Sequence, residues 1–362
     1  MNIVFILIAF VISAYIARLI IPRILLISFR KKLFDMPDER KVHKRAIPRL
    51  GGVSFFPTIL LSCCAVLVIR TLTGYEISTL LASYILPEFL VLICGMVLLY
   101  LTGIADDLVG VRYRQKFIVQ ILCASLFPAV GLWINDLYGL FGIDFISPYI
   151  GIPLTILTIV FITNAINLID GIDGLASGLS SVALLVFGFL FIEKGLWIYS
   201  MLAFSTFGPF FYYNVFGSAE HARKIFMGDT GSLTLGYILS FLAIKYSQNT
   251  ESIPVTQGAF VIAFSTLIVP AFDVVRVVIV RIYNGKSPFE PDKNHIHHQF
   301  LAMGFTVRQA MLLILLVSCV FSGINILLMP YVDNTLMLIG DIVVWIGLNL
   351  WWSNVRRKKI TA

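Results

Sequence analysis

Eleven apolar segments, each a candidate to cross a lipid bilayer, divide this chain of 362 residues. A bilayer core of about 30 Å needs about 20 consecutive apolar residues in a helix, and lipid leaves backbone polar groups no partners outside the segment. The segments are residues 2–24, 52–70, 88–105, 117–135, 149–168, 174–192, 196–214, 231–246, 255–280, 309–329 and 335–353. We therefore predict an all-α, polytopic membrane protein with about 11 transmembrane helices, organised as one transmembrane domain over residues 1–362.

The composition excludes an ordinary water-soluble domain. Hydrophobic residues make up 59% of the chain and charged residues 13%, whereas soluble domains carry roughly a quarter charged residues. The five cysteines all lie in apolar runs without a CxxC spacing, so we expect small buried side chains rather than disulfides or a metal site.

The basic residues predict the orientation of the chain. Many of them follow the first apolar segment: Arg30, Lys31, Lys32, Arg40, Lys41, Lys44, Arg45 and Arg49. Because basic loops stay in the cytoplasm, the N-terminus is expected outside and the C-terminus inside. The net charge of +7 is spread over short loops instead of one stripe, so we expect no nucleic-acid partner.

The unusual polar motifs fall at the cytoplasmic ends of the expected spans, in loops of about 25–51, 106–116, 169–173, 215–230 and 281–308. The first motif is Asp106-Asp107. Adjacent carboxylates repel each other unless a cation or a proton is shared, and Mg2+ prefers such oxygen ligands. The pair alone fits a solvated turn equally well.

The second motif ends the segment 149–168. Asn164, Asn167, Asp170 and Asp173 recur at three-residue spacing, which places the first three on one helix face. Helix capping explains Asp173 alone, so a functional use of the whole set is favoured.

The third motif is Phe226-Met227-Gly228-Asp229-Thr230-Gly231-Ser232. A carboxylate between glycines at a helix start suits a metal–phosphate site, although an ordinary helix cap has the same composition.

The fourth motif, in the loop 281–308, runs from Asp292 through Lys293 to His295, His297 and His298. Zinc is one alternative, but no cysteine lies nearby to complete a tetrahedral site. Contacts to a nucleotide diphosphate are favoured. Together the four motifs predict metal-assisted chemistry on a phosphate at the cytoplasmic face.

These motifs, with Arg49-Leu50-Gly51-Gly52 and Gln115-Lys116-Phe117, resemble the polyprenyl-phosphate N-acetylhexosamine-1-phosphate transferases of glycosyltransferase family 4. The matches keep the family's order from about residue 35 to 305. The His-Ile-His-His sequence and the eleven spans are similar to the WecA/TagO branch. The branch that transfers phospho-N-acetylmuramoyl-pentapeptide, MraY, typically has three consecutive histidines and ten spans, and is the alternative.

The resemblance implies roles for individual residues. It implies metal ligation by Asp229, Asp106 and Asp107, catalysis by these three with His295, and a base among the Asp106–Asp107 pair. It implies substrate contacts for Arg49, Lys116, Asn164, Asn167, Asp170, Asp173, Asn214, Phe226, Asp292, Lys293, His297 and His298. Phe226 is similar to an aromatic residue that stacks on uracil, and the match of Asn214 is weakened by its different spacing to Asp229.

The resemblance also implies the reaction. An undecaprenyl (polyprenyl) phosphate would attack a UDP-N-acetylhexosamine, most simply UDP-GlcNAc, with Mg2+ or Mn2+ as cofactor, and UMP would leave. The enzyme would lie in the bacterial inner membrane, and its product would prime O-antigen, teichoic acid or another surface glycan. A homodimer is compatible with the sequence. A nucleotide-sugar transporter is a further alternative, but transporters bind substrate near the bilayer midplane between repeats, and no repeat is evident.

Overall fold

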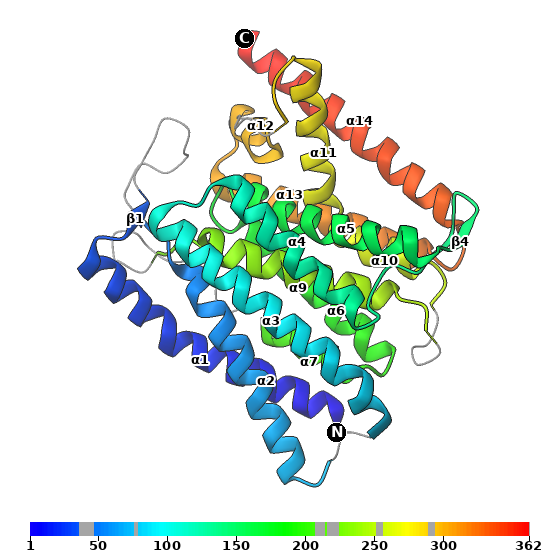
Figure 1. Ribbon diagram of the computed structural model, residues 1–362. Helices are drawn as coiled ribbons and strands as arrows, with labels where there is room; N and C mark the ends of the chain where they lie inside the picture. The colour runs from blue at the N-terminus through cyan, green and yellow to red at the C-terminus, as the bar shows by residue number, and fades with distance from the viewer. Residues whose placement is uncertain are drawn as a thin grey trace.

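The computed structural model describes residues 1–35, 47–75, 79–206, 214–215, 224–250, 256–288 and 294–361. Over these residues the protein is a bundle of helices, as the apolar segments predict (Figure 1). The helices of the first half are α1 (Asn2–Lys31), η1 (Gly51–Ser54), α2 (Phe55–Leu72), α3 (Thr79–Val109), α4 (Tyr113–Ala129), α5 (Pro148–Ile169) and α6 (Leu175–Glu193). Those of the second half are α7 (Trp197–Thr206), α9 (Gly228–Ser247), α10 (Ala259–Ser265), α11 (Ile268–Tyr283), α12 (Ile296–Ala302), α13 (Val307–Leu328) and α14 (Asn334–Thr361).

Helix α9 forms the centre of the bundle. Every residue from Thr230 to Ser247 is buried, and α3, α5 and α6 pack directly against the helix. Small residues allow the close approach: a Cβ at Gly236 would lie 2.6 Å from the Cα of Thr163 in α5. The helix that carries Asp229 is therefore enclosed by its neighbours on all sides.

The segment 255–280 is not one straight helix. It breaks at Thr266 and Leu267, so that α10 and α11 meet at a bend of 75°. The bend turns α11 away from the body of the bundle, toward α12 and the end of α14 (Figure 1).

The described chain contains seven helices that are long and apolar enough to cross a membrane, or eight if α10 and α11 form one broken span. The protein is a multi-pass membrane protein on this evidence. Helices α4 and α7 have 17 and 10 described residues, and the expected span 196–214 continues into residues outside the described part. The count of eleven spans and the orientation of the N-terminus stay predictions.

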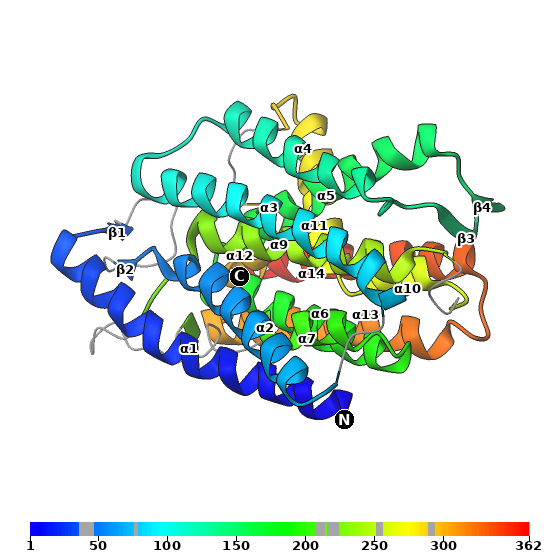
Figure 2. The same ribbon diagram turned by 60° about the horizontal axis from the view of Figure 1, so that its bottom comes forward.

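Two small antiparallel sheets mark the opposite ends of the bundle. β1 (Phe34–Asp35) pairs with β2 (Ile47–Pro48), and β3 (Asp136–Leu140) pairs with β4 (Ile143–Phe145). The N-terminus lies toward the β3–β4 end, away from β1 and β2, in both views (Figures 1 and 2). The polar motifs gather at the β1–β2 end.

Candidate active site

The start of α9 is held by the segment that follows β2. The backbone N–H groups of Gly51 and Gly52 donate to the carbonyl oxygens of Phe226 and Met227, at 2.9 and 2.8 Å. The two backbones are so close that a Cβ on Gly52 would lie 2.1 Å from the nitrogen of Gly231. The Arg49–Gly52 motif thus positions the Asp229 motif directly, although 180 residues separate Arg49 from Asp229.

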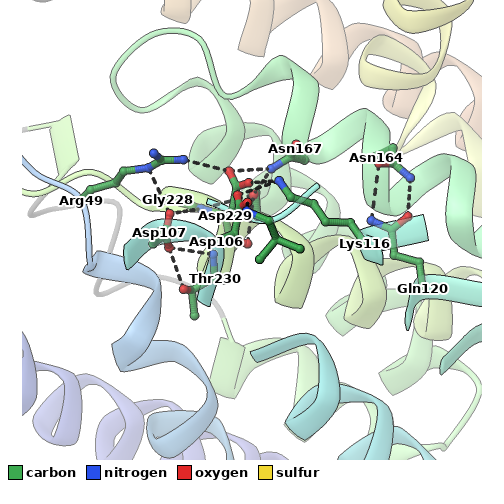
Figure 3. Close-up of polar contacts among 12 residues, drawn as sticks. Arg49, Asp106, Asp107, Lys116, Gln120, Asn164, Asn167, Gly228, Asp229 and Thr230 are labelled. Carbon is green, nitrogen blue, oxygen red and sulfur yellow. Dashed lines mark hydrogen bonds and ion pairs between the residues drawn. The ribbon is translucent and has the colours of Figure 1, made fainter. Parts of the chain in front are cut away.

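Asp107 caps α9 from another helix. Its side chain, at the end of α3, is 0% exposed. One carboxylate oxygen accepts from the N–H of Asp229 at 2.9 Å, and the other accepts from the N–H and the hydroxyl of Thr230 at 3.0 and 2.6 Å (Figure 3). The first N–H groups of a helix have no partner within it and favour a negative charge. The side chain of Asp107 supplies both the hydrogen-bond acceptors and the negative charge.

Asp106 and Asp229 share one cation. The ammonium of Lys116, in the first turn of α4, lies 2.6 Å from Asp106 Oδ2 and 2.5 Å from Asp229 Oδ2. Asp106 also accepts from the backbone N–H of Val111 at 2.6 Å. Three helices, α3, α4 and α9, therefore meet at a pair of carboxylates bridged by a positive charge.

The second oxygen of Asp229 faces two more donors. The amide of Asn167 donates to Oδ1 at 3.1 Å, and Nη2 of Arg49 lies 3.4 Å from the same atom. The Asn167 amide also contacts Ser232 at 2.8 Å, and Arg49 Nε lies 3.0 Å from Asp107 (Figure 3). Asp229 is thus the point at which the first, second and third motifs and the Arg49 segment converge. This convergence is what the sequence leads one to expect.

The turn after α5, residues 170–173, brings further acids beside this cluster, and we call it the acidic turn. Asp170, the residue at which α5 ends, is half-buried. Burial raises the pKa of Asp170 to about 8, and the charges of Asp229, Asp173 and Asp107 add to this effect, which Arg49 opposes. Asp173 forms an ion pair with Lys224.

The segment that contains His295, His297 and His298, which we call the histidine segment, packs onto the same turn. His297 is buried, and its ring fits against Gly171 so closely that a Cβ there would lie 2.1 Å from Nε2. Burial and the neighbouring His298 and His295 lower the pKa of His297 to about 3, so the ring is neutral at physiological pH. The rings of His295 and His297 stack in parallel at 6.0 Å. The fourth motif therefore joins the others through the acidic turn.

Two expected substrate ligands instead connect elements of the fold. Asn164 exchanges hydrogen bonds with Gln120 of α4, and its amide also donates to its own helix. Asn214 accepts from the N–H of Gly174 at 2.6 Å and donates to the carbonyl of Ile225 at 3.0 Å. These contacts join the end of the acidic turn to the segment before α9. Their expected substrate contacts stay predictions.

The remaining expected residues are Phe226, which is half-buried beside Met227, and Asp292 and Lys293, which lie outside the described residues. Sequence reasoning missed Gln120, Asp273 and Arg276, and it named Thr230 only as part of the third motif. Asp273 accepts from the ring of His295, and Arg276 pairs with it one turn along α11. A signal existed for both: an acid and a base three residues apart inside an apolar segment are costly in lipid and mark a functional site by default.

The residues fit a divalent cation in one particular way. Within the part of the chain that the structure describes, no three His, Cys, Asp or Glu side chains surround a common point as metal ligands. The oxygen atoms of Asp106 and Asp229 are nevertheless the hard ligands that Mg2+ prefers. Mg2+ is commonly bound by one or two carboxylates together with substrate phosphates, so the donor set suits a metal that arrives with a diphosphate.

Comparisons with known proteins give relatives over most of the chain. Residues 89–247 match the family model described as glycosyl transferase family 4. A Bacillus subtilis protein named a probable undecaprenyl-phosphate N-acetylglucosaminyl 1-phosphate transferase is 34% identical over 88% of this chain and 83% of its own length. Proteins from Yersinia pestis and Escherichia coli K12, named undecaprenyl-phosphate alpha-N-acetylglucosaminyl 1-phosphate transferases, are 31% and 30% identical over 83% and 82% of this chain, and over 78% and 76% of their own lengths.

The matched region contains the Asp106–Asp107 pair, the acidic turn and Asp229, and the relatives carry the names of the WecA/TagO branch. Together with the four motifs, now seen side by side, these likenesses show that the chain belongs to glycosyl transferase family 4, the family of the polyprenyl-phosphate N-acetylhexosamine-1-phosphate transferases.

Proposed function

We propose that this protein transfers GlcNAc-1-phosphate from UDP-GlcNAc to undecaprenyl phosphate and releases UMP. The observation that carries the proposal is the convergence on Asp229 of Asp106, Lys116, Arg49 and Asn167 from four separate segments. Phosphoryl transfer requires mainly positioning and neutralisation of charge, and this set provides both. The names of the relatives support the donor sugar and the acceptor lipid.

In this proposal Asp229 and Asp106 would hold Mg2+, or Mn2+ in its place, together with substrate phosphate oxygens. When bound, the metal would neutralise charge on the diphosphate. Asp107 already accepts from the backbone and hydroxyl groups at the start of α9, so its share of the chemistry is to keep Asp229 in place. A direct metal contact by Asp107 would require it to release some of these donors.

The residues of the chain then have distinct tasks. Lys116 and Arg49 bind phosphate oxygens, and Asp106 takes the proton of the lipid phosphate if one is present. An oxygen of the undecaprenyl phosphate forms a bond to the sugar-linked phosphorus, while the bond from that phosphorus to the oxygen of UMP breaks. The rings of His295 and His297, beside the acidic turn, contact the nucleotide diphosphate.

We place the site at the cytoplasmic face of the bacterial inner membrane. Supporting this, the last turn of α1 carries Arg30 and Lys31 and lies beside β1 (Figure 1), and the segment after β2, the partner of β1, binds the start of α9. Basic residues at span ends favour the cytoplasmic side. A lipid-linked sugar made there would prime a surface glycan such as O-antigen or teichoic acid.

The test is release of UMP from UDP-GlcNAc by purified protein in detergent, with undecaprenyl phosphate as acceptor. We expect radiolabelled sugar in the lipid phase, loss of turnover with EDTA and recovery with Mg2+ or Mn2+. A panel of UDP-sugars and UDP-N-acetylmuramoyl-pentapeptide tests the donor. Movement of intact UDP-GlcNAc across a vesicle membrane without UMP would instead identify a transporter.

A further inference from the structure

Asp273 is a carboxylate that the proposed reaction has not yet used. It lies in α11 with 0% exposure, one turn from Arg276, whose Nη2 is 2.7 Å from Asp273 Oδ1. A buried carboxylate is costly unless its lone pairs are satisfied. The other two donors that satisfy it both belong to the histidine segment.

These two donors are the ring and the backbone at the start of α12. Asp273 Oδ2 lies 2.8 Å from Nδ1 of His295, and Oδ1 accepts from the N–H of Ile296 at 3.0 Å. Arg276 reinforces the arrangement because it also donates to the carbonyl of Asn294. The α11 pair therefore fixes both the position of His295 and the rotation of its ring.

The contact also determines the role of each ring nitrogen. An ionised carboxylate can only accept, so Nδ1 of the ring must be the donor to Asp273, and Nε2 is the ring nitrogen left for another partner. His295 is 6% exposed, and among the described residues no hydrogen bond reaches its Nε2. An acid that fixes the tautomer of a histidine in this way commonly controls its chemistry.

His295 is placed to use this nitrogen on the substrate. Its ring stacks on His297, which packs against Gly171 in the acidic turn beside Asp229. We infer that Asp273, supported by Arg276, is a positioning residue of the transfer reaction: it holds His295 through Nδ1, so that Nε2 is the ring nitrogen that donates to an oxygen of the nucleotide diphosphate. This inference rests on the proposed function.

Two substitutions at Asp273 separate this role from a purely structural one. Asp273→Asn is nearly isosteric, but its amide can stabilise either tautomer, and we expect kcat/KM for UDP-GlcNAc to fall at least about ten-fold. Asp273→Glu fits less well in a buried site but keeps the carboxylate, and we expect it to retain more activity than Asp273→Asn. A structural role predicts the reverse order.

A double-mutant cycle gives the second test. If Asp273 acts through His295, then Asp273→Asn should cost little further activity in a His295→Ala background. An additive loss in that background, or less than a two-fold loss in Asp273→Asn alone, would overturn the inference. Loss of folded protein in both Asp273 variants, with and without His295→Ala, would also overturn it, because Asp273 would then be needed for the fold. Absence of UMP release in the wild type would instead contradict the proposed function.

Discussion

The cap that Asp107 places on α9 makes a prediction that separates the two members of the Asp106–Asp107 pair. Asp107→Asn keeps one carbonyl oxygen, which can still accept from the N–H of Asp229. At the position of the other oxygen, the new amide group faces two donors of Thr230. The hydroxyl can rotate to accept, but the backbone N–H is left unsatisfied.

The magnitude follows from these contacts. A hydrogen bond to a charged group contributes roughly 1.5–3 kcal/mol, and the ion pair to Arg49 adds less than about 1 kcal/mol because the arginine is partly exposed. We therefore expect Asp107→Asn to lower the stability of the folded protein by roughly 2–4 kcal/mol. For a long chain this corresponds to a fall in Tm on the order of 2 °C per kcal/mol.

The assay combines unfolding and turnover. Tryptophan fluorescence follows thermal unfolding in detergent, since the chain has five tryptophans, and UMP release gives kcat and KM. Asp107→Asn should lower both Tm and kcat. The matched control is Asp106→Asn, which should abolish turnover while its Tm falls less than that of Asp107→Asn. If Asp107→Asn keeps the wild-type Tm and loses only turnover, the capping argument is refuted.

Three further predictions concern neighbouring parts of the site. Gly52→Ala would place a Cβ 2.1 Å from the backbone of Gly231, so we expect it to cost about 1–3 kcal/mol of stability and most of the activity. The control is Gly340→Ala, where the new Cβ meets open space. Equal UMP release by the two variants would contradict the close-packing argument. Lys116→Met leaves two carboxylates without their shared cation, so kcat/KM should fall by about 100-fold, equivalent to about 3 kcal/mol. Initial rates at several UDP-GlcNAc concentrations measure this fall. A loss below five-fold would contradict the role of Lys116 as the cation shared by Asp106 and Asp229. Folding raises the pKa of Asp170 to about 8 from its ordinary 3.8, so its contribution to stability is present below pH 4 and is lost as the pH rises toward 8. In EDTA, the Tm of Asp170→Asn should therefore rise relative to the Tm of the wild type between pH 5 and 9. Parallel curves of Tm against pH for the two proteins would exclude the raised pKa.

Much of the fold could be predicted from the sequence because lipid allows few solutions. A long apolar run in a membrane must be a helix, so helices occur at each expected segment. The break between α10 and α11 was missed, although the sequence holds a signal for it. Pro270 follows the break closely and has no N–H to donate to the preceding turn, so a continuous helix is disfavoured there. The sequence does not show that α9 lies at the centre, since burial inside protein and burial in lipid require the same residues.

The candidate site was predictable to a similar degree. Charged and amide side chains at the ends of apolar runs identified Asp106, Asn167 and Asp229, which the fold brings together. The different roles of Asp106 and Asp107 could not be predicted, because the two adjacent residues contact different partners only once α9 is in place. Asp273 was overlooked because it lies within a span rather than at its end.

The enclosed position of α9 has a consequence for how the protein is made. This helix carries Asp229, Lys245 and a series of serine and threonine residues, and it is not among the helices apolar enough to enter lipid on their own account. Its packing partners η1, α3, α5 and α6 precede it in the chain, whereas α10, which also packs against it, follows. A ribosome therefore completes most of the elements around α9 before it makes α9. The helix that bears the reactive aspartate can thus insert against protein that is already present instead of against lipid.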